Sequence, residues 1–172
     1  MDHEVDGDSR VDAAVWPQPT RAGQVALITG GSAGLGLEIA GTLARAGSSV
    51  VLASRSADRC GQAAARLAAA TGGQAAGHPC DVTDERAVAE LVERVMTDHG
   101  RLDVLVTSAG VQARGTLEQL DVRTLRTCLD VNVVGTWLAC RAAAVPMRAA
   151  GYGRIVTLAS ALGLVGSAAR AG

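Results

Sequence analysis

A glycine-rich segment, TGGSAGLG at residues 29–36, carries the clearest chemical signal in the sequence. It follows a short apolar run and precedes a stretch with helical spacing, which predicts a strand, a turn and a helix. Glycines in such a turn let the backbone approach a phosphate closely, and the helix N-terminus offers its free N–H groups to the anion. The spacing is not GxGxxG, and a P-loop would need Lys where Leu37 stands. We expect a phosphate-binding loop, with a plain glycine-rich turn as the alternative.

The rest of the sequence predicts the elements that must position this loop. Apolar runs predict strands within 24–29, 49–54, 74–82, 102–110 and 153–160, and helical spacing predicts helices within 34–47, 57–73, 83–100 and 116–150. Gly47 is expected to end the helix within 34–47, and Thr83 to open the helix within 83–100. Pro146 is expected to break or kink the helical region within 116–150. The alternation predicts an α/β fold with a doubly wound parallel sheet. Ligands bind such sheets at the carboxyl ends of the strands, where the strand order reverses.

Composition narrows the class of protein. The 172 residues fit one domain; we expect a disordered acidic tail over 1–22 and a domain over 23–172. A net charge of -1, 2% aromatic residues and the lack of a long apolar run argue against nucleic-acid and membrane partners. The cysteines and histidines have no metal-ligand spacing, and no signal peptide is recognisable. We therefore expect a cytoplasmic protein with reduced thiols and no metal.

Four more motifs follow the glycine loop, and their order is more specific than any one of them. They are CDVTDERAV (80–88), TSAG (107–110), NVVG (132–135) and GRIVTLAS (153–160). Together with TGxxxGxG they resemble the short-chain dehydrogenase/reductase family, from about Gln24 to the last residue. The resemblance implies a Rossmann-type fold, an NAD(P) cofactor, and hydride transfer between nicotinamide and a secondary alcohol or ketone. It is nearest to the 3-oxoacyl-carrier-protein reductase and gluconate 5-dehydrogenase-like branch.

The resemblance also assigns roles to residues. The cofactor-binding residues that we infer are Thr29, Gly30, Ser32, Gly34, Leu35, Gly36, Ser54, Arg55, Asp81, Val82, Ser108, Ala109 and Gly110. In the family, Asp81 would face the adenine amino group, with Val82 beside the ring. The catalytic residues carried over are Asn132, which would hold a relay water and distort its helix, and Ser160, which would hydrogen-bond the substrate oxygen.

Each of these roles has a structural alternative. Asp81 could cap the turn that it opens, Asn132 could be a structural amide, and Ser160 could be a turn or cap residue. Ser108 stands where the family usually has Asn. A hydroxyl donates one hydrogen bond rather than two, so the link between the fourth strand and the glycine loop should be weaker.

The end of the second strand bears on the choice of cofactor. A carboxylate there would bind the ribose hydroxyls of NAD and repel a 2′-phosphate. Ser54 and Arg55 instead offer a hydroxyl and a guanidinium, which suit a phosphate. The sequence therefore favours NADP over NAD, although Arg55 could also lie over the adenine face or in solvent.

The family's acid/base is a Tyr with a Lys four residues later, which the resemblance places just past Gly172. The sequence has no Lys, and its one Tyr, Tyr152, has Val156 four residues later and is expected in a turn. We therefore expect an N-terminal portion that lacks the catalytic Tyr and Lys and the C-terminal strands and helices. Its last strand would then be an unpaired edge, and the chain made alone should be poorly soluble or partly molten.

The sequence suggests two candidate functions and argues against a third. The first is a short-chain NAD(P)-dependent oxidoreductase acting on a small-molecule alcohol or ketone, whose full-length family is expected to form homo-oligomers. The second is a non-catalytic dinucleotide-binding module. The third, a methyltransferase, would need a GxGxG-type loop and an acidic residue ending the second strand, and neither is present.

Overall fold

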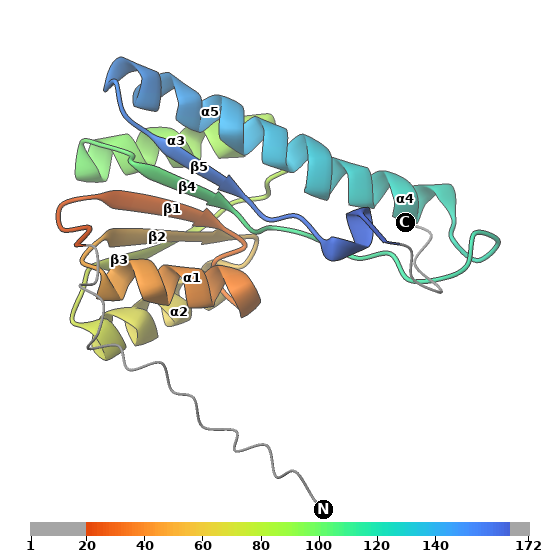
Figure 1. The fold of residues 1–172 in the computed structure, drawn as a ribbon, viewed down its shortest axis with the longest axis horizontal. Coiled ribbons are helices and arrows are strands. Elements are labelled where there is room, and N and C mark those ends of the chain that lie inside the picture. Colours follow the sequence, from red (N-terminus) through yellow and green to blue (C-terminus); the bar gives the residue numbers. More distant parts are fainter. Residues whose placement is uncertain (1–19, 166–172) are drawn as a thin grey trace, which may run out of the picture.

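The computed structural model describes residues 20–165, whose five parallel strands form one sheet with helices on both faces (Figure 1). The strands are β1 (Val25–Thr29), β2 (Ser49–Ser54), β3 (Ala75–Pro79), β4 (Val104–Thr107) and β5 (Arg154–Thr157). Their order across the sheet is β3-β2-β1-β4-β5. The direction of strand addition reverses between β1 and β4, so the ligand-binding crevice of such a sheet is expected beside the carboxyl ends of these two strands.

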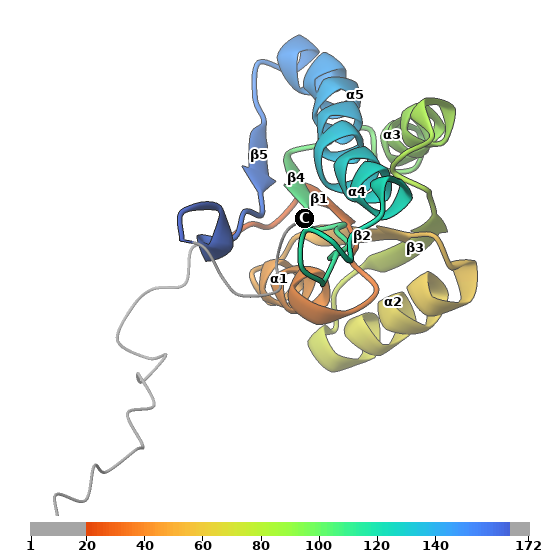
Figure 2. The same ribbon diagram turned by 90° about the vertical axis from the view of Figure 1, so that its right-hand side faces the viewer.

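The helices form two layers (Figure 2). They are α1 (Gly34–Arg45), α2 (Ala57–Thr71), α3 (Glu85–His99), α4 (Val122–Leu129) and α5 (Thr136–Ala149), with a π-helical segment η1 (Asp130–Gly135) and a 3-10 turn η2 (Ala161–Gly163). Helices α1 and α2 cover one face of the sheet, while α3 and α5 cover the other. The predicted doubly wound α/β fold is confirmed.

The core lies on both faces of the sheet because successive side chains of a strand point in opposite directions. Leu27 and Leu105 pack in the cluster that includes residues of α3 and α5, whereas Ile28 and Val106 pack in the cluster with α1 and α2. All four side chains are buried. Continuous apolar runs therefore mark these strands, as expected for a parallel sheet covered on both sides.

The predicted elements are all present, and the prediction for one helix start is wrong. Asp84, rather than Thr83, caps α3, because the Asp84 carboxylate accepts hydrogen bonds from the backbone N–H groups of Arg86 and Ala87. Pro146 lies inside α5, which continues to Ala149, so the helix is not broken at this residue, and the kink stays a prediction. Gly47, with φ +98°, follows the end of α1 as predicted.

Helices α4 and α5 are joined through η1 into one helix, Val122–Ala149, that is long and apolar enough to cross a bilayer by length and composition. The expectation that no segment meets this criterion is wrong, because the π-helical segment keeps two shorter helices continuous. One side of this helix packs in the core through Leu138, Ala143 and Met147. These residues all lie in α5, and 28% of the apolar window of the long helix is buried inside the structure. The criterion is met by length and composition alone, which does not by itself make the helix a membrane span.

Strand β5 lies at the edge of the described sheet and pairs with β4 alone. Its apolar residues Ile155 and Val156 are 41% and 49% exposed. The expected exposed edge is therefore seen among the described residues, while the expected low solubility stays a prediction.

The N-terminal tail predicted over 1–22 falls mostly outside the described residues. At its end, the backbone N–H of Arg21 donates to the carbonyl of Ala46 at 2.7 Å. The contact ties the chain to the end of α1 before β1 begins.

Asp103 links β1, β4 and β5 at the amino ends of the strands, on the side of the sheet opposite the crevice. Its Oδ2 accepts hydrogen bonds from the backbone N–H of Val25 and from Arg101, at 2.8 Å each, and its Oδ1 accepts from Arg101 at 2.7 Å. Its carbonyl accepts from the N–H of Arg154, at the start of β5. Burial alone would raise the pKa of Asp103, but the hydrogen bonds from Arg101 and Val25 hold it below the ordinary value.

We predict that Asp103 makes the fold sensitive to acid. Because its pKa is lower in the folded chain, its stabilising contribution is present above the unfolded-state pKa of about 3.9 and is lost as the pH falls through the lower folded value. Asp103→Asn should lower the free energy of unfolding at pH 7 by about 1–3 kcal/mol. It should also flatten the decrease in stability below about pH 4. Urea denaturation between pH 3 and pH 7 measures both effects.

The matched control is Asp98→Asn, at an exposed position of α3. It should leave the stability at pH 7 nearly unchanged. An Asp103→Asn chain as stable as the original at pH 7 and equally steep below pH 4 would contradict this account of Asp103.

Candidate cofactor site

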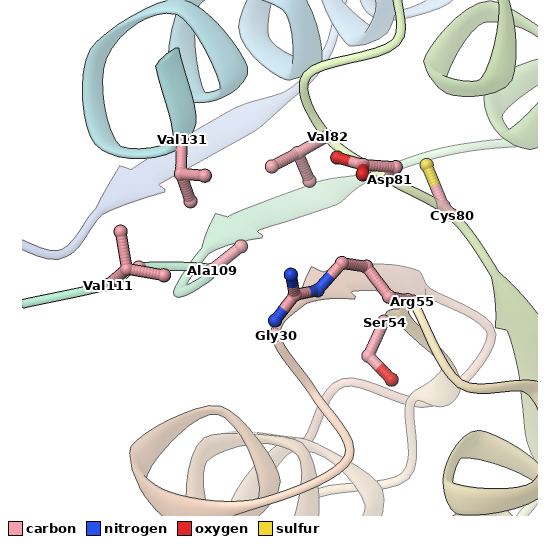
Figure 3. Close-up of a pocket in the computed structure, with 10 residues that line it drawn as sticks. Gly30, Ser54, Arg55, Cys80, Asp81, Val82, Ala109, Val111 and Val131 are labelled. Carbon is pink, nitrogen blue, oxygen red and sulfur yellow. The ribbon is translucent and has the colours of Figure 1, made fainter. Parts of the chain in front are cut away.

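A cavity of about 140 Å³ opens at the carboxyl ends of the strands, beside the point where the strand order reverses (Figure 3). Its walls come from the ends of β1, β2 and β4, the segment after β3, and η1. The lining residues are Gly30, Ser54, Arg55, Cys80, Asp81, Val82, Ala109, Gly110, Val111 and Val131. Segments far apart in the sequence, each predicted to carry cofactor-binding or catalytic residues, therefore meet in one cavity.

The glycine loop is pressed against the end of β4. Gly30 has φ +68°, and a Cβ there would come within 2.7 Å of the backbone of Ser108 and Ala109. A Cβ on Gly36 would come within 2.6 Å of the Gly30 carbonyl oxygen. Thr29 Oγ1 also accepts a weak hydrogen bond from the N–H of Ala109 at 3.4 Å. Close backbone packing thus links the loop to β4 where the family usually has Asn at position 108.

The N-terminus of α1 faces the same loop without a side-chain cap. Its N-cap residue, Ala33, makes no side-chain cap hydrogen bond, whereas Ser56, Asp84 and Asp121 cap α2, α3 and α4. The first N–H groups of a helix have no partner within the helix, so this end can bind an anion. The predicted residues here do not line the cavity but form the turn and first helical residues beside it: Ser32, Gly34, Leu35 and Gly36.

The two polar residues at the end of β2 point in different directions. Arg55 is exposed and reaches across the cavity, with its guanidinium toward Gly30, as Figure 3 shows. The Ser54 hydroxyl points away from that guanidinium. Its Oγ lies 3.0 Å from the Sγ of Cys60, in the first turns of α2. Both residues line the cavity, but Arg55 alone presents its polar group across it.

Asp81 holds the turn between β3 and α3. Its Oδ1 accepts hydrogen bonds from the backbone N–H of Thr83 at 3.0 Å and from the Thr83 hydroxyl at 2.8 Å. These bonds, with a smaller effect of the nearby Arg55 charge, hold the pKa of Asp81 below its ordinary value. The turn-capping alternative is therefore seen in the structure, and Asp81 also lines the cavity.

Val82 and Cys80 form the apolar side of the cavity. A Cβ on Gly135 would lie 2.7 Å from Val82 Cγ2, so glycine at the end of NVVG lets the long helix approach this wall. Burial, with the charges of Asp81 and Asp84, raises the pKa of the Cys80 thiol to about 11. The thiol is therefore neutral at physiological pH and behaves as part of an apolar wall.

Asn132 lies within η1, where the helix is locally widened as the resemblance implies. Its Oδ1 accepts from the backbone N–H of Val111, and its Nδ2 donates to the Val111 carbonyl, both at 2.9 Å. The amide therefore satisfies both backbone groups of a cavity-lining residue. The Asn132 amide therefore has a structural role here, which is the alternative considered in the sequence analysis.

Ser160 and Tyr152 lie at opposite ends of β5. Ser160 follows the carboxyl end and caps η2, since its Oγ accepts from the N–H of Leu162 at 3.2 Å. Tyr152 precedes the amino end, in the segment between α5 and β5, and its hydroxyl accepts from Gln24 Nε2 at 3.2 Å. Ser160 thus lies on the side of the sheet where the strands have their carboxyl ends and where the cavity opens. Tyr152 lies on the side where the strands have their amino ends.

Sequence reasoning missed three lining residues, Cys80, Val111 and Val131. Each is next to a predicted motif residue: Cys80 precedes Asp81, Val111 follows Gly110, and Val131 precedes Asn132. The signal was their position beside those motifs, but an apolar side chain in an apolar sequence does not reveal that it faces a cavity.

Comparison with known proteins agrees with this site. Residues 24–172 match the family described as short chain dehydrogenase. The chain is 37% identical over 145 residues to the D-beta-hydroxybutyrate dehydrogenase of Rhizobium meliloti (strain 1021), covering 84% of this chain and 56% of that protein.

Solved structures show the same fold. A structure of NAD+-bound xylitol dehydrogenase is similar with a TM-score of 0.84 and 32% identity, covering 87% of this chain and 58% of that one. A metagenomic short-chain oxidoreductase in complex with NADP is similar with a TM-score of 0.81 and 36% identity, covering 87% and 68%. The chain thus spans less than two thirds of the length of the curated relative and of the xylitol dehydrogenase. By its motifs, its fold and the match over residues 24–172, the chain belongs to the short-chain dehydrogenase/reductase family.

Proposed function

We propose that the cavity binds the adenosine part of NADP, or of NAD, and that the protein is an oxidoreductase that uses this cofactor. One observation carries the proposal: the glycine loop, the end of β2 and the CDV segment line a single cavity at the reversal point of the sheet. The residues fit the group. Gly30 lets the loop pack on the backbone of Ser108 and Ala109, which brings the uncapped start of α1 to the end of the sheet, and such a helix start suits a phosphate.

The preference for NADP rests on Arg55. It is the cationic residue among those that line the cavity, and neither residue at the end of β2 is acidic. A guanidinium binds a phosphate through charge-assisted hydrogen bonds, while no carboxylate there repels a 2′-phosphate. The similar structures include one with NAD+ and one with NADP, so likeness alone does not decide between the two.

The proposed reaction is hydride transfer between the nicotinamide, which supplies or accepts the hydride, and a secondary alcohol or ketone. Asn132 would hold the loop at Val111 in place and carry the relay role of the family. Ser160 would hydrogen-bond the substrate oxygen, which requires its hydroxyl to donate while its oxygen caps η2. The 3-oxoacyl-carrier-protein reductase-like branch stays a hypothesis about the substrate.

A second candidate, a non-catalytic dinucleotide-binding module, is favoured by the position of Tyr152. The sequence has no Lys, and its one Tyr lies at the amino ends of the strands, on the side of the sheet opposite the cavity. The 172 residues therefore contain the cofactor-binding elements without a Tyr and Lys pair beside them. Turnover of a ketone with NADPH by this chain would exclude the module, and binding without turnover would support it.

We propose a small-molecule substrate, a cytoplasmic location and self-association, as expected for the full-length members of the family. We also propose a tail over 1–22 and a domain over 23–172, although Arg21 in that tail already contacts Ala46 at the end of α1.

We predict that Arg55→Ala weakens NADPH binding about tenfold and leaves NADH binding within about twofold. The reason is that a charge-assisted hydrogen bond is worth about 1.5–3 kcal/mol and that about 1.4 kcal/mol is a tenfold change in affinity. Isothermal titration calorimetry of the original chain and the variant with both cofactors measures the two ratios.

Arg94→Ala, at an exposed position of α3, is the matched control and should change neither affinity. Equal losses of NADPH and NADH affinity in Arg55→Ala would contradict the proposed contact with the 2′-phosphate. Lack of binding of either cofactor to the original chain would contradict the proposed function itself.

We also predict that Asn132→Ala speeds hydrogen exchange at the Val111 amide, because its acceptor is lost. Asn132→Asp keeps an oxygen acceptor and should retain more of the protection. Exchange followed by mass spectrometry or NMR gives both rates. If Val111 exchanges equally slowly in all three chains, Asn132 does not hold this loop.

A further inference from the structure

A buried thiol contacts the end of β2 from outside the cavity. Cys60, in α2, is fully buried and does not line the cavity. Its Sγ lies 3.0 Å from Ser54 Oγ and 3.9 Å from the Ser54 carbonyl oxygen. Cys60 therefore contacts the hydroxyl and the carbonyl oxygen of the residue that ends β2. The Ser54 hydroxyl, which makes the first of these contacts, points away from the Arg55 guanidinium in Figure 3.

The sheet is shaped to bring this thiol close. A Cβ on Gly77, in β3, would lie 2.4 Å from the carbonyl carbon and oxygen of Cys60 and 2.8 Å from the N of Gly61. Because position 77 has no side chain, the start of α2 can pack directly on the backbone of β3. The backbone N–H of Cys80 completes the arrangement by donating to the Ser54 carbonyl at 2.9 Å. Ser54 is thus held from α2 and from the end of β3.

This geometry separates the two residues that should recognise a 2′-phosphate. Arg55 reaches across the cavity, while the Ser54 hydroxyl is turned to Cys60. We propose that Cys60 is a specificity-determining residue that acts through Ser54: its thiol holds the Ser54 hydroxyl against α2 and so lowers the affinity of the cavity for a ribose that carries a 2′-phosphate. The proposal rests on the proposed function, since it assumes that the cavity binds adenosine nucleotides.

The size of the effect follows from the competing hydrogen bonds. A hydroxyl that turns to a phosphate must first leave its sulfur partner, and such a bond contributes about 0.5–1.5 kcal/mol. Removing the partner should therefore raise the affinity for the 2′-phosphate about two- to tenfold, since about 1.4 kcal/mol is tenfold. A ligand with a 2′-hydroxyl in place of that phosphate can gain only an uncharged hydrogen bond from the freed hydroxyl, so its affinity should rise less than that of the phosphorylated ligand.

The experiment uses two nucleotides that differ in the 2′-phosphate alone, adenosine 2′,5′-bisphosphate and adenosine 5′-monophosphate. Isothermal titration calorimetry gives the ratio of their dissociation constants for the 172-residue chain. Cys60→Ala should bind the bisphosphate about two- to tenfold more tightly and the monophosphate within about twofold of the original. Cys60→Ser restores a hydrogen-bonding partner and should return the ratio toward that of the original chain.

Two further variants show whether Cys60 acts through Ser54. In a Ser54→Ala background, Cys60→Ala should leave the ratio unchanged. Cys128→Ala, which removes another buried thiol in α4, should also leave it unchanged. An unchanged ratio in Cys60→Ala, or a shift that persists without the Ser54 hydroxyl, overturns the proposal. If the original chain binds neither nucleotide, the proposed function fails and the role of Cys60 fails with it.

Discussion

The site depends on one steric constraint, the close approach of the glycine loop to the end of β4. Any side chain at Gly30 would overlap the backbone of Ser108 and Ala109, and any at Gly36 would overlap the Gly30 carbonyl. Because these atoms are in contact, α1 begins directly beside the ends of β1 and β4. Its uncapped N–H groups then lie at the crevice where a sheet of this topology binds ligands.

The opposite wall of the cavity depends on the same kind of contact. Gly135 lets the long helix approach Val82, and Asn132 fixes the segment after β4 by two hydrogen bonds to Val111. Close packing at these glycines thus brings the walls of the cavity together, and the lining residues with a polar N- or O-bearing side chain are Ser54, Arg55 and Asp81. Arg55 presents its charge across the cavity, whereas the Ser54 hydroxyl is taken up by Cys60.

The sequence was sufficient for the fold and for most of the lining because both depend on local patterns. Apolar runs located the strands, and parallel strands bring their carboxyl ends to one edge, so Gly30, Arg55 and Asp81 could be expected together. The details that failed depend on tertiary packing. Thr83 and Asp84 are both good caps, and only the backbone path decided for Asp84. The contact of Ser54 with Cys60 needs α2 to lie on Gly77, which no periodicity reveals.

The most direct test of the central claim is hydrogen–deuterium exchange of the 172-residue chain with and without NADPH. The account predicts slower exchange at the loop ends that meet in the cavity, which are those at 29–36, 54–56, 80–83 and 107–111. It predicts little change in exchange at the amino ends of the strands, around Asp103 and Tyr152, which is the opposite edge of the sheet. Protection confined to that opposite edge, or no protection at a saturating concentration, would contradict a dinucleotide site at the carboxyl ends of the strands.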